Sequence, residues 1–233
     1  MREFFKVAVL ASAAFSLTSC SMFHEKDDYD PKVEPKEFRA RVDNPWMPLL
    51  PGTVYRYRER KGTELAEDVV TVTNDVKNVM GVPCTVVHDV VSESGKIKED
   101  TYDWYAQDQE GNVWYFGEDA KAYDERGVVS TEGSWEAGVD GAKPGIIMFA
   151  NPQPGPEYWQ EHATDAQDKA QVVALRERVQ VPFGNYTDTV RTKEWSELEV
   201  GSGMKWYARG VGFVRSQNED GEVVELVEIS KTP

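Results

Sequence analysis

Thr53-Val54-Tyr55-Arg56-Tyr57-Arg58-Glu59 alternates between residues of different polarity and follows the turn sequence Pro51-Gly52. Successive side chains of a β-strand point to opposite faces, so this period of two predicts a strand with one buried face. Similar alternation, or a run of β-branched and aromatic residues, recurs over 69–73, 82–91, 96–106 and 112–116. Turn sequences separate these tracts every 10–15 residues or so, which favours antiparallel strands over strand–helix units.

The second half of the chain continues the same pattern. Further strands are expected over 158–162, 172–181, 188–198, 204–208, 212–215 and 223–229, while residues 163–171 could form a helical turn or an edge strand. Residues 134–156 combine many Gly and Pro residues with large apolar ones, which predicts an ordered loop. We therefore expect an all-β fold: a curved antiparallel sheet, half-barrel or barrel of about 9–11 strands with one long ordered Gly/Pro-rich loop.

The first twenty residues have the features of a secretory signal. A basic start is followed by an apolar run, residues 7–15, that is too short to cross a bilayer as a helix. Leu17-Thr18-Ser19-Cys20 resembles the lipobox of bacterial lipoproteins. The resemblance implies cleavage before Cys20, a lipid on its sulfur and acylation of its new amino group. Ser21 after the cysteine favours sorting to the outer membrane.

Three parts of the chain are therefore expected. Residues 1–19 are the signal peptide, residues 20–40 are the lipidated Cys20 with a flexible acidic tether, and residues 41–233 are a single β-rich domain. The tether is polar and contains prolines, so it cannot bury enough apolar surface to offset its ordering entropy. The expected partner of Cys20 is the membrane. The second cysteine, Cys84, lies in an apolar strand-like setting and is expected to be a buried, unreactive thiol.

The charge of the chain excludes some classes of partner. It carries 41 acidic and 26 basic residues, a net charge of −15. Proteins that bind nucleic acid concentrate positive charge, so no nucleic acid partner is expected. Electrostatic adhesion to anionic lipid is disfavoured for the same reason. The acidity is explained either by a solvated surface or by cation binding.

The densest aromatic segment, residues 102–119, predicts a hairpin with 108–112 as its turn. Aromatic pairs across its strands would stabilise it. Its carboxylates also offer the oxygen ligands that Ca²⁺ prefers, so a calcium-like site is the one cofactor hypothesis. The residues of that hypothetical site are Asp103, Asp108, Glu110, Glu118 and Asp119. The turn resembles part of an EF-hand loop but lacks its glycine spacing and distal Glu, so it is not one.

Seven tryptophans are a large number for a domain of this size. Most are expected to fill the core, since large aromatic side chains dominate the burial of apolar surface. Trp104, Trp114 and Trp135 are the candidates for contact with a ligand, either a sugar ring or an apolar molecule. Trp135 is the strongest of the three because it lies in the Gly/Pro-rich segment.

Motifs of known catalytic centres do not occur in the sequence. It holds no Gly-x-Ser-x-Gly elbow, no phosphate-binding glycine loop and no His-Glu-x-x-His. His88 and His162 are expected at the surface or in satisfied positions. Two carboxylates about 5–10 Å apart could hydrolyse a glycoside, but sequence spacing selects no pair among so many acids.

Four segments together resemble a family of β-rich secreted or lipid-anchored bacterial envelope proteins with no assigned activity. They are residues 44–49, 103–119, 133–138 and 204–214, and the likeness extends over residues 43–215. It implies a shared fold and a cell-envelope location, and it transfers no catalytic residue. A weaker likeness, of architecture alone, relates the chain to lipoprotein-carrier half-barrels.

These observations predict a lipid-anchored envelope lipoprotein with a non-catalytic binding domain. The expected ligand is an apolar or lipid-like molecule held in the concave face of the sheet. One alternative is a carboxylate-based hydrolase acting on envelope glycans. The other is a structural or interaction lipoprotein that docks a protein partner.

Overall fold

The computed structural model describes residues 28–124 and 126–232 of the chain. The predicted signal peptide and Cys20, the predicted lipidation site, lie outside these residues. The described part is almost entirely β, with one 3-10 turn, η1 (Pro35–Glu37), and no α-helix. Within these two ranges, no helix has the length and apolar character needed to span a membrane.

Eighteen strands form among the described residues, and eleven of them have six or more residues. The longer strands are β2 (Thr53–Lys61), β3 (Glu64–Val79), β4 (Val82–Glu93), β5 (Lys96–Asp108), β6 (Val113–Tyr123), β9 (Lys143–Met148), β12 (Asp168–Leu175), β15 (Thr189–Ser196), β16 (Gly203–Ala208), β17 (Gly212–Asn218) and β18 (Val223–Lys231). The shorter ones are β1 (Phe38–Arg39), β7 (Val129–Ser130), β8 (Trp135–Glu136), β10 (Tyr158–Trp159), β11 (Glu161–His162), β13 (Val179–Val181) and β14 (Gly184–Tyr186). The predicted all-β class is confirmed.

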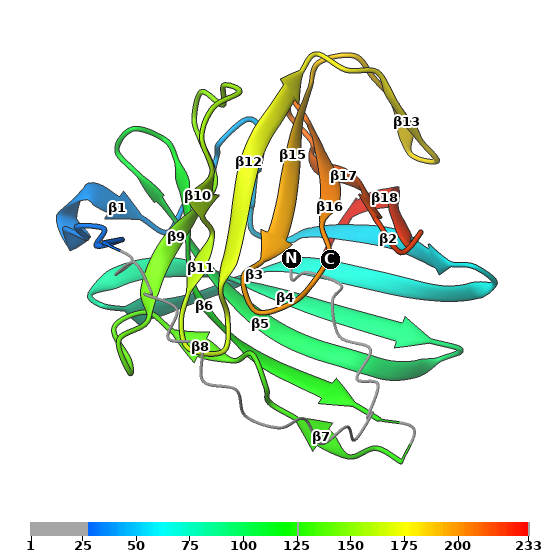
Figure 1. Ribbon diagram of the computed structural model, residues 1–233, viewed down its shortest axis with the longest axis horizontal. Helices are drawn as coiled ribbons and strands as arrows, with labels where there is room; N and C mark the ends of the chain where they lie inside the picture. Colours follow the sequence, from blue (N-terminus) through cyan, green and yellow to red (C-terminus); the bar gives the residue numbers. More distant parts are fainter. Residues whose placement is uncertain (1–27, 125, 233) are drawn as a thin grey trace, which may run out of the picture.

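The long strands form one antiparallel sheet that curls into a nearly closed barrel (Figure 1). Neighbouring strands follow the order β12-β15-β16-β17-β18-β2-β3-β4-β5-β6-β9. The barrel has one seam, between β9 and β12. There β10 pairs with β12 and β11 pairs with β9, and only Gln160 separates β10 from β11. The Gln160 amide donates a hydrogen bond to the carbonyl of Asp168 at 2.8 Å, so this short stretch bridges the seam.

Strand β2 shows how the sequence sets the inner face of the barrel. Tyr55, Tyr57 and Glu59 are buried, while Arg56 and Arg58 between them face outward. The Tyr57 ring lies 5.2 Å from the ring of Phe213, centroid to centroid, across the barrel interior. The alternation predicted for this segment is therefore confirmed, and it places both tyrosines and a carboxyl group inside the barrel.

Residues 42–49 close one end of the barrel. Val42, Met47 and Leu49 are buried, and the Leu49 amide donates to the carbonyl of Val42 at 3.0 Å. Bonds from the strands fix this segment: the Tyr55 hydroxyl donates to the carbonyl of Pro48 at 2.8 Å. The core thus fills the barrel at this end. The β2–β3, β4–β5 and β17–β18 turns lie at the opposite end.

The Gly/Pro-rich segment, residues 134–156, is ordered as expected but contains strands β8 and β9. Its large apolar residues are buried, including Trp135 and Met148. Strand β9 pairs with β6 and extends the sheet to the seam. The physical reason is Gly145, whose missing side chain leaves room for the backbone of residues 159 and 160 to pack directly against the strand.

Gly145→Ala is expected to destabilise the protein by about 1–3 kcal/mol, the usual cost of overpacking. A Cβ at this position would lie 2.4 Å from the carbonyl oxygen of Gln160 and 2.5 Å from that of Trp159. Urea unfolding of the mature protein measures the loss. Gly155→Ala is the matched control, because the atom nearest to its Cβ would be the carbonyl oxygen of Gln153, 3.6 Å away. Equal stabilities for the two variants would contradict the packing of the seam.

The described part of the predicted tether, residues 28–40, lies on the domain. Strand β1 pairs with β5, and the Phe38 ring packs edge-on against Trp114. Nearer the N-terminus, the Tyr29 hydroxyl donates to the carbonyl of Pro144 at 2.7 Å, and its ring lies 5.5 Å from that of His162. Tyr29 therefore contacts β9 and β11, the two strands on one side of the seam.

Candidate functional site

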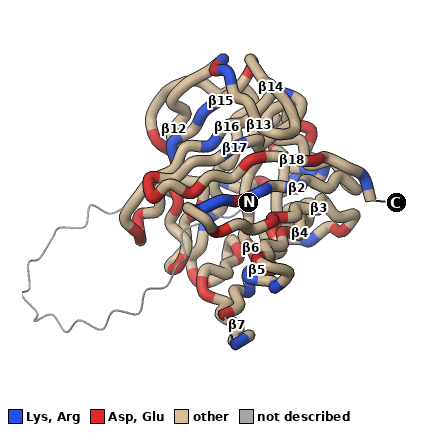
Figure 2. Tube along the Cα trace, turned by 90° about the vertical axis from the view of Figure 1, so that its right-hand side faces the viewer, with Lys and Arg blue, Asp and Glu red and all other residues tan. Residues whose placement is uncertain are grey.

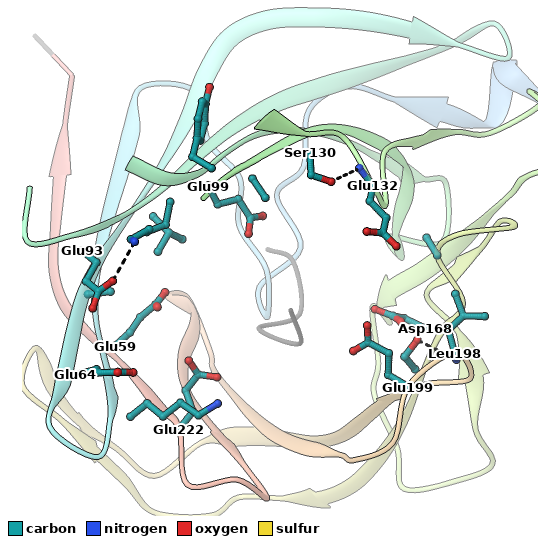
Figure 3. A pocket seen from close by; sticks show the side chains of 18 of the residues that line it. Glu59, Glu64, Glu93, Glu99, Ser130, Glu132, Asp168, Leu198, Glu199 and Glu222 are labelled. Atoms are coloured by element: carbon teal, nitrogen blue, oxygen red, sulfur yellow. Dashed lines mark hydrogen bonds and ion pairs between the residues drawn. The ribbon is translucent and has the colours of Figure 1, made fainter. Parts of the chain in front are cut away.

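The open end of the barrel contains a cavity of about 540 Å³ (Figure 3). Its lining is dominated by carboxyl groups: Glu59, Glu64, Glu93, Glu99, Glu132, Glu161, Asp165, Asp168, Glu199 and Glu222. Three basic residues also line it: Arg60, Lys61 and Lys98. Its apolar lining residues are Leu65, Ala66, Val91, Ala122, Ala166 and Leu198. The sequence led us to expect an apolar or lipid-like ligand in the concave face, and this end of the barrel combines apolar side chains with an excess of carboxyl groups.

The position of these acids follows from strand alternation. Along β2 the inward-facing residues run from Tyr55 near the closed end to Glu59 at the cavity. The neighbouring strands repeat the pattern, since Asp68 of β3 and Asp89 of β4 also face inward and are buried. The interior therefore changes from aromatic at the closed end to acidic at the open end.

Glu59 has the most unusual environment of the lining residues. Its side chain points into the cavity, yet the residue is only 5% exposed (Figure 3). Among residues 28–124 and 126–232, no hydrogen-bond partner reaches its Oε1. Burial raises the pKa of Glu59 to about 9, and the nearby carboxylates of Glu222, Asp89 and Glu99 contribute to the increase. Glu59 therefore retains its proton at neutral pH.

A pair of buried acids, Asp68 and Asp89, lies close to Glu59. The carboxyl groups of Asp68 and Asp89 form a hydrogen bond with each other across β3 and β4. Burial raises the pKa of Asp68 well above its ordinary value, and the charges of Asp89 and Glu59 raise it further. Burial also raises the pKa of Asp89, to about 6. Two buried carboxyls in contact cannot both ionise easily, so the pair holds a proton near neutral pH.

Two of the three basic lining residues are bound to acids at the rim. Lys61 forms an ion pair with Asp220, and Lys98 lies 3.5 Å from a carboxylate oxygen of Glu93. Asp and Glu outnumber Lys and Arg in the whole sequence, and Figure 2 marks both kinds of residue along the described part of the trace. The basic groups offset only part of the negative charge, so acidic residues remain in excess in the lining.

The five residues of the hypothetical calcium site occupy different surroundings. Asp103 and Glu118 are directly opposite each other on β5 and β6, and both are buried. The Tyr115 hydroxyl donates to Asp103 at 2.5 Å. Asp119 is the neighbour of Glu118 in sequence, and it is exposed on the other face of the sheet.

The remaining two residues of that set lie in the β5–β6 turn. Asp108 accepts hydrogen bonds from the Asn112 amide and from Trp114 Nε1, both at 2.7 Å. Glu110 is exposed. Within the part of the chain that the structure describes, no three Asp, Glu, His or Cys side chains converge in a geometry that could hold a metal ion. The structure therefore does not bring these five residues together.

The three candidate tryptophans pack against the protein and do not line the cavity. Trp104 is 6% exposed, and the Lys77 ammonium lies 3.3 Å from its ring centroid. Trp135 is 8% exposed and meets Tyr115 edge-on, with ring centroids 5.4 Å apart. Trp114 is partly buried and donates its indole hydrogen to the β5–β6 turn. In the described structure, all three contribute to packing.

Three groups that could serve catalysis do not line the cavity: Asp103, Glu118 and His88. Asp103 and Glu118 face each other close to Trp135, but their burial prevents contact with a sugar. His88 pairs with Asp100 at 2.8 Å and stacks on Tyr102, with ring centroids 4.2 Å apart. These contacts satisfy the histidine locally.

No protein-family model matches the chain, and no curated protein matches it significantly. Two solved structures show a similar arrangement. One is a "putative exported protein with YmcC-like fold" from Bacteroides fragilis, with a TM-score of 0.49 and 16% identity, covering 80% of this chain and 99% of that one. The other is a "putative lipoprotein" from Parabacteroides distasonis, with a TM-score of 0.47 and 15% identity, covering 79% and 98%.

Proposed function

We propose that this protein is a lipid-anchored envelope protein whose barrel is a non-catalytic binding domain for a small organic cation. The anchor is Cys20, supported by the lipobox resemblance, and Ser21 favours the outer membrane. The observation that carries the proposal is the cavity at the open end of the barrel, in which ten acidic side chains outnumber three basic ones.

Charge determines which ligand suits this cavity. Low-dielectric walls of one charge sign focus the electrostatic potential and concentrate ions of the opposite sign. A fatty acid would bring its own carboxylate toward many others, which disfavours an anionic lipid as the ligand. Apolar lining residues such as Leu65, Val91 and Leu198 can still contact the hydrocarbon part of an organic cation. An amine with an aliphatic chain therefore combines both features of the lining.

Binding of hexylamine and not of hexanoate is the expected result for the mature lipoprotein in nanodiscs of zwitterionic lipid. The two compounds have the same chain length and opposite charge, so the difference isolates the charge preference of the cavity. Isothermal titration calorimetry measures both, with empty nanodiscs as the control. Affinity for the amine should fall as salt is added. Binding of hexanoate as tight as that of hexylamine would refute the proposal.

Glu222→Gln is expected to weaken amine binding roughly fivefold, equivalent to about 1 kcal/mol. Glu222 is a partly exposed lining residue, so the loss of its charge makes the potential of the cavity less negative without removing core packing. Glu110→Gln removes the same charge from the β5–β6 turn, outside the cavity, and is the matched control. Calorimetry that finds equal affinities for the two variants would place the amine elsewhere.

A further inference from the structure

Six of the ten carboxyl groups of the cavity lie in two sets on opposite walls. Glu59, Glu64 and Glu222 belong to the wall formed by β18, β2 and β3. Glu132, Asp168 and Glu199 come from segments near the seam, which lies across the barrel from β2 in the strand order. Figure 3 shows the two sets facing each other across the open space. A ligand must therefore satisfy two separated centres of negative charge.

This separation distinguishes between kinds of cation. A divalent metal ion needs several oxygen ligands around one point, at distances of about 2.0–2.6 Å. In residues 28–124 and 126–232, no group of three or more acidic, His or Cys side chains meets that requirement. The cavity instead fits a molecule that carries its positive charges at separate positions.

One carboxyl group indicates where such a molecule would bind. Glu59 is 95% buried, points into the cavity and has an Oε1 that none of the described groups reaches with a hydrogen bond. A buried polar atom without a partner carries a free-energy cost that a donor from a ligand removes. An ammonium group supplies three donors and one positive charge, and its binding favours the ionised form of this carboxyl, so Glu59 releases its proton when the ammonium binds.

The lining between the two sets suits the rest of the molecule. Four small apolar residues line the cavity together with the acids: Ala66, Val91, Ala122 and Ala166. Methylene groups can contact these residues without losing hydrogen bonds. The volume of about 540 Å³ falls within the range of small-molecule sites and exceeds the need of a single ion.

We propose that the cavity binds a linear polyamine, with one ammonium group at Glu59 and Glu222 and another at Asp168 and Glu199 on the opposite wall. This inference rests on the cation binding proposed above and specifies its ligand. The first ammonium to bind holds the second close to the far wall, so the second interaction is intramolecular and raises the overall affinity.

A series of amines tests this inference on the mature lipoprotein in zwitterionic nanodiscs. We expect 1,6-diaminohexane and spermidine to bind at least roughly tenfold more tightly than hexylamine at equal ionic strength, because they engage both walls. Magnesium chloride should not displace them beyond the effect of its ionic strength. Equal affinities for hexylamine and the diamine would overturn the polyamine inference and leave cation binding intact. Failure of all three amines to bind would overturn both.

Paired variants locate the two charges of the ligand. Glu222→Gln and Glu199→Gln each remove one charge from a different wall, and Glu199 is exposed, so its replacement leaves the core unchanged. The double variant should reduce the advantage of diaminohexane over hexylamine to about threefold or less. Glu110→Gln should retain the full advantage. An undiminished advantage in the double variant would show that the diamine does not span the two walls.

Discussion

Glu59→Gln is expected to stabilise the protein by up to about 6 kcal/mol at pH 9 and above, and to change its stability little near pH 4. The pKa of Glu59 rises from 4.5 to about 9 on folding, chiefly through burial. Below pH 4.5 the carboxyl is protonated in both states, so folding carries no penalty. Between pH 4.5 and 9 the unfolded chain ionises while the folded protein keeps its proton. Stability is therefore lost as the pH rises through this window.

Urea unfolding at pH 4.5, 7 and 9 measures this effect. The wild type should lose stability steeply as pH rises, and Glu59→Gln should lose less, because glutamine resembles the protonated acid and cannot ionise. Asp68 and Asp89 titrate in both proteins, so the difference between the two curves reports the ionisation of Glu59 together with its effect on Asp68. Glu110→Gln should follow the wild-type curve. Parallel curves for wild type and Glu59→Gln would show that Glu59 is not held protonated by the fold.

Lys205→Met is expected to cost about 3–5 kcal/mol of stability, the usual cost of leaving a buried charge without its partner. The Lys205 ammonium lies 2.8 Å from the Glu194 carboxylate, and the Glu194 side chain is 1% exposed. Thr192 also donates to Glu194, at 2.6 Å, but a hydroxyl cannot replace the positive charge. Removing the ammonium therefore leaves a buried carboxylate poorly compensated.

Chemical unfolding of two further variants separates charge from packing. Glu194→Gln combined with Lys205→Met removes both charges and should recover most of the lost stability. Arg58→Met breaks an exposed pair with Glu225, 3.2 Å apart, and should cost less than about 1 kcal/mol. If Lys205→Met were no more harmful than Arg58→Met, the ion pair would not be the source of the stabilisation.

The main strands could be predicted because their signals are local. Residues 53–59 alternate in polarity, and the structure buries the expected face of β2. Residues 102–119 form the predicted hairpin, in which Tyr105 and Tyr115 stack with ring centroids 4.7 Å apart. Within a hairpin, strand period and turn chemistry are sufficient, because the pairing residues are near in sequence.

The seam could not be predicted because it depends on contacts between distant segments. Strand β9 lies in a stretch rich in glycine and proline, and only its neighbours β6 and β11 make it a strand. The sequence around Gly145 is typical of a loop, but in the fold this glycine provides space for the backbone at residue 160. The same applies to Tyr29, whose contact with Pro144 no local pattern indicates.

The acidic cavity was missed for a related reason. Alternation could have placed Glu59 inside the barrel, but the meeting of Glu59 with Glu222 and Asp168 requires the closed sheet. One signal was present: acids flank alternate turns of the strand meander, near residues 62–63, 94–95 and 219–221. Every second turn of a meander lies at the same end of the sheet, so the acids at these turns must lie at the same end of the barrel.

A crystal structure of the protein grown with spermidine tests the central claim most directly. We predict density for one extended molecule inside the barrel, with an amine nitrogen within hydrogen-bond distance of Glu59 and another near Asp168 or Glu199. Spermidine bound only on the outer surface, with the cavity empty at a saturating concentration, would contradict the account.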